Sequence, residues 1–263
     1  MVDIHHHLLW GLDDGARDFE TSVEMAKLAS ADGITHVVCT PHANGQYEFN
    51  PELNREKVDQ LSARLEKDGV PLTLGLGSDF HLSYDNIQEA NLNPHRFSIN
   101  GLGYLMVELP DFGLPQGVGE ILYQLRMSGL TPVLTHPERN PTLQMDDSKL
   151  KDWMRADLLI QVTADSVLGK MGKKAEKMAH QLLKKRWVHF LATDAHGTRS
   201  RPPRMRAAAD IVAKKYGAAY AESLVTTNPR AAFEGKRLRP LEQPVGLYEE
   251  FKPKSWFQRM LGK

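Results

Sequence analysis

Hydrophobic residues along the chain gather into short continuous runs, and longer segments with helical periodicity separate these runs. Continuous apolar runs rich in β-branched residues are typical of strands buried on both faces of a parallel sheet. The runs occupy residues 2–4, 36–40, 72–76, 104–109, 131–135, 158–162 and 189–193. Their alternation with helical segments, repeated about seven times, predicts a parallel α/β fold.

The helical segments carry recognisable ends. The clearest helix is expected over 51–67, because Asn50 can cap it, Pro51 suits its first turn and Gly69 follows its end. Further helices are expected over 21–31, 120–128, 173–186 and 204–215. No repeat or long linker precedes residue 235, so we predict one domain over 1–235 and a C-terminal extension over 236–263.

Composition narrows the class of protein. A length of 263 residues suits one large domain, and α/β barrels often reach this size. Lysine plus arginine equals aspartate plus glutamate at 33 each, so no global basic field predicts a nucleic-acid partner. The single cysteine excludes an internal disulfide and fits a reducing compartment. Without a visible signal peptide or membrane span, a cytoplasmic location is expected.

Metal-binding residue types follow nearly every predicted strand. They are His5, His7, His42, Asp79, Glu108, His136, Asp194 and His196. In a parallel barrel the carboxyl ends of all strands meet on one face, which carries the active site. This pattern favours a barrel over an open doubly wound sheet, for which no phosphate-loop or dinucleotide motif follows the first strand.

The same residues predict a metal centre. Histidine, aspartate and glutamate together are ligands for zinc, manganese and iron. Alternate residues of a strand point the same way, so His5 and His7 can reach one metal while His6 points elsewhere. The same rule pairs Asp194 with His196. These ligands are too many for one tetrahedral ion, so several metals are predicted. A purification tag is disfavoured because apolar residues flank the histidine run on both sides.

The motifs DIHHHLLWGLDDGA, TPH, GSD, VEL, THPER and TDAHGTRSRPP, in this order and spacing, resemble the PHP (polymerase and histidinol phosphatase) superfamily. More narrowly, they resemble the bacterial metal-dependent tyrosine phosphatases of capsule and exopolysaccharide clusters. The resemblance covers roughly residues 1–235. It implies a distorted seven-stranded TIM-like (β/α) barrel with two or three divalent ions, usually manganese, with iron or zinc as alternatives.

The resemblance also implies a role for each matching residue. The implied ligands are His5, His7 and Asp194 for one metal, Glu108 and His136 for a second, Asp79 as the bridge between them, and His42, His196 and Asp14 (alternatively Asp13) for a third. Arg139 and Arg201 match the arginines expected to bind phosphoryl oxygens. The bridging residue is usually glutamate, so the shorter Asp79 must change the metal spacing or the backbone approach. His81, two residues further along the strand, could supplement it.

The implied reaction is hydrolysis of phosphotyrosine by metal-activated hydroxide, since bound metals lower the pKa of water towards about 7. Phenolate is a good leaving group, so the reaction depends only weakly on a general acid. Asp14 and metal-bound water are the candidates for that acid. Cysteine-based tyrosine phosphatases need an arginine six positions after the cysteine. Cys39 is followed by glycine at position 45 and lies in an apolar run, so that mechanism is excluded.

Three functions remain open. By resemblance, the substrate is the tyrosine-rich tail of an autophosphorylating bacterial tyrosine kinase that controls polysaccharide export. The alternative enzyme is a PHP phosphatase of a small phosphomonoester, such as histidinol phosphate or a nucleotide. A metal-binding relative without turnover is the third reading, and the nearly intact ligand set and both arginines argue against it.

Several residues outside these motifs have two interpretations. Trp10 and Phe80 could wall an aromatic pocket, although core packing is favoured for both. Glu138 and Asp165 could orient ligand histidines or lie at the surface as solvated acids. The C-terminal extension places Trp256, Phe257, Met260 and Leu261 among basic residues at amphipathic helical spacing. That spacing predicts either a peripheral membrane contact or packing against the barrel.

Overall fold

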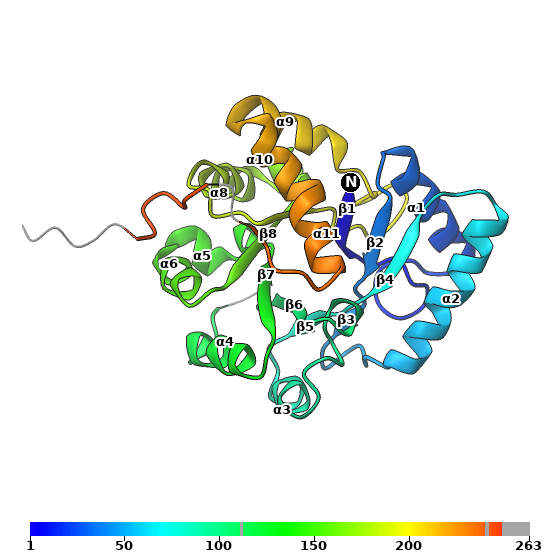
Figure 1. Ribbon diagram of the computed structural model, residues 1–263, viewed down its shortest axis with the longest axis horizontal. Helices are drawn as coiled ribbons and strands as arrows, with labels where there is room; N and C mark the ends of the chain where they lie inside the picture. The colour runs from blue at the N-terminus through cyan, green and yellow to red at the C-terminus, as the bar shows by residue number, and fades with distance from the viewer. Residues whose placement is uncertain (111–112, 240–241, 249–263) are drawn as a thin grey trace, which may run out of the picture.

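The computed structural model describes residues 1–110, 113–239 and 242–248, and it confirms the parallel α/β fold (Figure 1). The first sheet has the order β1 (Val2–His6), β2 (His36–Cys39) and β4 (Thr73–Leu76). The second has the order β3 (His42–Ala43), β5 (Asp79–His81), β6 (Tyr104–Glu108), β7 (Thr131–Thr135), β8 (Leu159–Thr163) and β9 (Phe190–Ala192). All strand pairs are parallel, and each predicted apolar run overlaps a strand.

The described strands form two sheets of three and six strands, so the predicted single seven-stranded barrel is not found in that form. The sheets divide where two strands are interrupted, between β2 and β3 and between β4 and β5. Pro41 lies in the first interruption and has no N–H to donate to a neighbouring strand. Its carbonyl still accepts from Asp79 N at 3.1 Å, and an isolated parallel bridge joins His6 to Ala195 beyond β9.

Helices surround the strands, and α11 crosses in front of them in Figure 1. Their bounds are α1 Phe19–Ala31, α2 Pro51–Lys67, α3 Tyr84–Leu92, α4 Val118–Met127, α5 Pro141–Met145, α6 Ser148–Arg155, α7 Ala164–Val167, α8 Lys173–Lys184, α9 Arg206–Tyr216, α10 Ala218–Glu222 and α11 Asn228–Phe233. The five predicted helices are present: α2 has the predicted bounds, and the ends of the other four differ by at most two residues. Asn50 caps α2 as expected, since its side chain accepts from Leu53 N. Among the described residues, no helix combines the length and hydrophobicity needed to cross a membrane.

Core packing accounts for the two aromatic residues considered as pocket walls. Phe80 of β5 is completely buried. Trp10 packs edge-on against Phe19, with ring centroids 4.7 Å apart, and the Lys57 ammonium lies 4.1 Å from its ring centroid. Both residues therefore pack in the fold, which is the interpretation that the sequence favoured over an aromatic pocket.

The described residues that follow α11 are hydrogen-bonded to the rest of the fold. Tyr104 Oη donates to the carbonyl of Lys236 at 2.7 Å, and Trp187 Nε1 donates to that of Val245 at 3.0 Å. Arg155 Nε donates to the carbonyl of Leu247 at 2.9 Å. The predicted amphipathic segment around Trp256 lies outside the described residues, and the domain boundary at residue 235 stays a prediction.

Candidate metal centre

The predicted ligands converge on one central cavity of about 260 Å³ at the carboxyl ends of the strands. Its lining residues are Asp14, His42, Asn44, Gln46, Tyr47, Asp79, His81, Glu108, His136, Arg139, Asp194, His196 and Arg201. The other two predicted ligands, His5 and His7, are buried next to this lining and contact Asp194. Parallel strands alone explain the gathering, because each strand delivers its last residues to the same face.

The first ligand group joins His5, His7 and Asp194. Asp194 Oδ1 lies 3.4 Å from Nε2 of each histidine, and the two Nε2 atoms are 3.3 Å apart. Donor atoms bound at about 2.1 Å to one tetrahedral ion would be about 3.4 Å apart, so this spacing fits a single cation. His5 Nε2 also lies 3.4 Å from Asp79 Oδ2, which brings the predicted bridging carboxylate beside this group.

A second group lies around Asp79, which is paired in register with His42 on the adjacent strand. Asp79 Oδ2 is 3.3 Å from His42 Nδ1, and Glu108 Oε2 is 3.5 Å from the same nitrogen. The other Glu108 oxygen, Oε1, lies 3.5 Å from His136 Nε2. His81 Nε2 lies 4.0 Å from Glu108 Oε2, at the edge of this group.

The third group is nearest the solvent. Asp14 Oδ1 lies 3.4 Å from Nε2 of both His42 and His196. His7 also belongs to this group, and its ring centroid is 3.8 Å from that of His196. His5, Asp79 and His136 form a further group, so the described residues contain four overlapping groups. His5, His7, His42 and Asp79 each belong to two of them, whereas the resemblance assigned each of these histidines to one metal.

An observation independent of these donor–donor distances also indicates that the side chains can bind divalent cations. Both carboxylate oxygens of Asp79 and Nδ1 of His42 are buried, and none has a hydrogen-bond partner among the described residues. Buried polar atoms without partners are costly, and a cation between them would satisfy all three. Imidazole and carboxylate together suit manganese, iron and zinc.

The pKa shifts of the buried carboxyl groups also favour bound cations. Burial and the neighbouring Asp79 raise the pKa of Glu108 to about 9. Burial also opposes ionisation of Asp194, but His5, His7 and Arg201 hold its pKa well below the usual range. Carboxylates this close repel one another, and bound divalent cations would allow all of them to remain ionised.

Three contacts hold the ligand histidines with Nε2 directed towards the cluster. His5 Nδ1 donates to Gln161 Oε1 at 2.9 Å, and His7 Nδ1 donates to Asp13 Oδ2 at 2.7 Å. His196 Nδ1 donates to the carbonyl of Asp194 at 3.0 Å. Such contacts fix the tautomer and the ring orientation of metal-binding histidines.

Sequence reasoning missed Gln161, whose only signal was an amide side chain inside the apolar run LLIQV. Asp13, which was the alternative ligand to Asp14, bonds to His7 instead and lies outside the ligand groups. Neither Glu138 nor Asp165 bonds to a ligand histidine among the described residues. Glu138 is buried and accepts from Thr163 N at 3.0 Å, while Asp165 pairs with Lys170.

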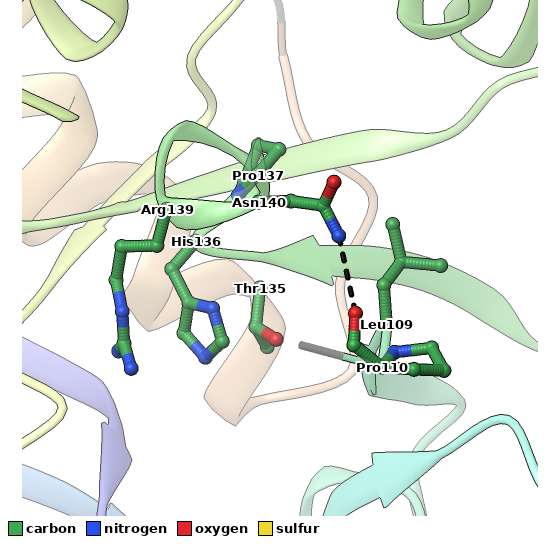
Figure 2. A pocket seen from close by; sticks show the side chains of 7 residues that line it. All are labelled: Leu109, Pro110, Thr135, His136, Pro137, Arg139 and Asn140. Carbon is green, nitrogen blue, oxygen red and sulfur yellow. Dashed lines mark hydrogen bonds between the residues drawn. The ribbon is translucent and has the colours of Figure 1, made fainter. Parts of the chain in front are cut away.

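The two predicted phosphoryl-binding arginines meet at Asp194. Arg139 Nη1 donates to Asp194 Oδ2 at 2.5 Å, and Arg201 Nη2 donates to the same oxygen. Figure 2 shows Arg139 and His136 extending to one side of the Pro137–Arg139 turn, while Asn140 points to the other side. Asn140 Nδ2 donates there to the carbonyl of Pro110 at 3.2 Å and so anchors the turn that carries both site residues.

Three site residues have left-handed backbone conformations that favour glycine. The φ angles are +32° at His136, +52° at Asp194 and +50° at Arg201. Each such residue costs on the order of 1–3 kcal/mol. Side chains that no glycine could supply are retained at all three positions, which is typical of functional sites.

His6 lies outside the ligand groups. It is completely buried, neither ring nitrogen has a hydrogen-bond partner among the described residues, and burial lowers its pKa to about 3. We expect His6→Ala to lower the free energy of unfolding by about 2–4 kcal/mol through the cavity that it leaves. His6→Leu should cost less than about 1.5 kcal/mol, because it fills the space and removes two unpaired nitrogens.

Thermal unfolding and phosphatase assays of both His6 variants check this prediction. Folded His6→Leu protein should keep most of its turnover. A loss as large as that from removing a ligand of the cluster would show that His6 takes part in the site.

Fold and site together define a class: α/β proteins with a candidate multi-metal centre at the carboxyl ends of parallel strands. The family model "Capsular polysaccharide synthesis, CpsB/CapC" matches residues 1–234, so this chain belongs to the CpsB/CapC family. YwqE of Bacillus subtilis, a tyrosine-protein phosphatase, is 33% identical over 218 residues, which cover 82% of this chain and 85% of YwqE. CpsB of Streptococcus pneumoniae, also a tyrosine-protein phosphatase, is 28% identical over 88% of this chain and 97% of its own length.

Solved structures agree with the family assignment. A chain from the crystal structures of YwqE and CpsB, described as unique metal-dependent tyrosine phosphatases, matches with a TM-score of 0.86 and 32% identity. The match covers 93% of this chain and 99% of that chain. A lactonase from Listeria monocytogenes matches with a TM-score of 0.58 at 10% identity, over 90% of this chain and 95% of its own, which shows a shared fold alone.

Proposed function

We propose that this chain is a metal-dependent protein-tyrosine phosphatase that hydrolyses phosphotyrosine in a phosphoprotein of polysaccharide synthesis. The observation that carries the proposal is the cluster of four overlapping ligand groups, among the described residues, beside two arginines at one cavity. The similarity to tyrosine phosphatases over most of the chain supports it.

The proposal gives each group of side chains a role. The nine residues His5, His7, Asp14, His42, Asp79, Glu108, His136, Asp194 and His196 would hold two or three divalent ions, with manganese proposed and iron or zinc as alternatives. Bound ions would supply Lewis acidity and a water of lowered pKa. Arg139 and Arg201 would bind the phosphoryl oxygens, because guanidinium is planar, presents paired donors and keeps its charge.

Asp14 is better suited to hold a cation than to give a proton. Its hydrogen bonds with His196 and His42 hold its pKa below the usual range, so its carboxylate is ionised. A proton donor must carry a proton at the working pH, which an ionised carboxylate does not. We therefore propose Asp14 as a ligand, and water as the source of the proton for the leaving phenolate.

The proposal extends to the finer fold and the partner. We infer that the two sheets act as one distorted barrel of seven strand segments, because β3 and β5 continue β2 and β4 and a bridge joins His6 to Ala195. A bacterial tyrosine kinase is the proposed substrate, and the cytoplasm is the proposed location. The kinase rests on the sequence resemblance, and the location rests on the single cysteine, which fits a reducing compartment. The division into 1–235 and 236–263 rests on the lack of a repeat or long linker before residue 235.

The test compares two substrates under defined metals. The protein is stripped with a chelator, reloaded with manganese, iron or zinc separately, and assayed on a phosphotyrosine peptide and on histidinol phosphate. We expect manganese to support the highest activity and kcat/KM to favour the peptide. Hydrolysis of histidinol phosphate, with none of the peptide under any metal, would replace this function with the small-substrate alternative.

A further inference from the structure

The loop between β3 and α2 contributes an aromatic side chain to the central cavity. Among the described residues that line this cavity, Tyr47 alone presents a phenyl ring, and the others are charged, imidazole or amide side chains. The Tyr47 ring is half-buried and nearly parallel to the imidazole of His42, with an interplanar angle of 14° and centroids 5.8 Å apart. An aromatic wall therefore lies directly beside the candidate ligands.

The loop is organised by its own hydrogen bonds. Asn44 Oδ1 accepts from the backbone N–H groups of Gln46 and Tyr47, at 2.8 and 2.9 Å. The backbone N–H of Asn44 donates in turn to the carbonyl of Tyr47 at 3.0 Å. These bonds fix the backbone of Tyr47 before any substrate binds, which lowers the entropy cost of packing a ligand against its ring.

Tyr47 also lies where the central cavity meets a second one. The neighbouring cavity, of about 420 Å³, is lined by Asn44, Gly45, Gln46, Tyr47, Glu48, Phe49, Asp85, Asn86, Glu89, Arg96 and Phe97. It shares three residues with the central cavity: Asn44, Gln46 and Tyr47. The two cavities are therefore adjacent at the loop that carries Tyr47.

We propose that Tyr47 determines specificity by packing against the phenyl ring of phosphotyrosine, so that aryl phosphomonoesters are bound in preference to alkyl ones. The residues that flank the phosphotyrosine would occupy the neighbouring cavity. Aromatic rings attract one another at centroid distances of about 4.5–7 Å, in offset or edge-to-face arrangements. This inference rests on the proposed phosphatase function and assigns a residue to its choice of substrate.

The experiment measures the ring preference without turnover. Phenylphosphonate and methylphosphonate share the same anionic group and differ in the ring, and neither is hydrolysed. Isothermal calorimetry on the manganese-loaded full chain gives the ratio of their dissociation constants. In Tyr47→Leu the preference for phenylphosphonate should fall about five-fold, while methylphosphonate binding should change little. Tyr47→Phe should keep the preference, because it keeps the ring.

Tyr123→Leu is the matched control, since Tyr123 is exposed on α4 and lines neither cavity. It should bind both phosphonates as the wild type does. Metal content and thermal unfolding of each variant separate ring packing from damage to His42. An unchanged preference in Tyr47→Leu, or an equal loss for both phosphonates, would overturn the inference. Wild-type protein that prefers phenylphosphonate but does not hydrolyse a phosphotyrosine peptide would count against the proposed function instead.

Discussion

Removing divalent ions with a chelator is expected to lower phosphotyrosine hydrolysis by at least about a thousandfold, equivalent to about 4 kcal/mol of transition-state stabilisation. The physical reason is that no other group at the site can supply the nucleophile. The cysteine is completely buried and does not line the cavity, and the described cavity presents imidazole, carboxylate, amide, guanidinium and phenol side chains. Readdition of manganese should restore the rate, as measured with a phosphotyrosine peptide before and after metal replacement.

Alkylation of the cysteine thiol is the control treatment for metal removal. Cys39 is completely buried, and burial raises the pKa of its thiol, so the reactive thiolate is not formed in the native protein. Native protein treated with iodoacetamide should therefore keep its activity and its mass. The opposite pattern, with activity resistant to the chelator and lost on alkylation, would remove the metal mechanism.

Asp194→Asn is expected to reduce kcat/KM by about a thousandfold or more. Asp194 is almost fully buried and uses its two oxygens differently. Oδ1 lies 3.4 Å from Nε2 of both His5 and His7, while Oδ2 accepts from two arginines. An asparagine of nearly the same shape lacks the charge, and its amide cannot replace both oxygens as acceptors, so the metal ligands and the arginines are disturbed together.

Asp165→Asn is the matched control, because Asp165 is also a mostly buried acid with a cationic partner, Lys170, but lies outside the central cavity. It should keep wild-type turnover. Metal content by mass spectrometry should fall in Asp194→Asn and remain normal in Asp165→Asn. An Asp194→Asn enzyme that keeps a tenth of wild-type kcat/KM and its full metal content would contradict this role.

The sequence predicted the parallel strands and the residues at their ends, because both follow from local pattern. A continuous apolar run defines a buried strand, and parallel strands bring their last residues to one face. His42 and Asp79, which are 37 positions apart in the sequence, are therefore register partners on β3 and β5. That proximity required only the fold class, without any knowledge of side-chain conformation.

The unpredicted features depend on conformations that pattern does not encode. Which histidines are shared depends on side-chain rotamers, and His5, His7 and His42 each reach two groups. Gln161 stands in an apolar run, and only the three-dimensional contact reveals that it accepts from His5. The division of the strands around Pro41 is a local backbone effect that the apolar runs do not encode. Tyr47 lies in a polar loop, where no periodic pattern indicated that its ring lines the cavity.

The left-handed backbone at His136, Asp194 and Arg201 has a consequence for engineering this chain. Substitution by glycine at each position would relieve backbone strain and delete a side chain of the site. At His136, which makes no ion pair with an arginine among the described residues, selection for heat resistance alone would therefore favour a replacement that eliminates catalysis. A thermostable variant that still works should be sought elsewhere, on surface helices and loops remote from the cavity, with these three positions held fixed in the library.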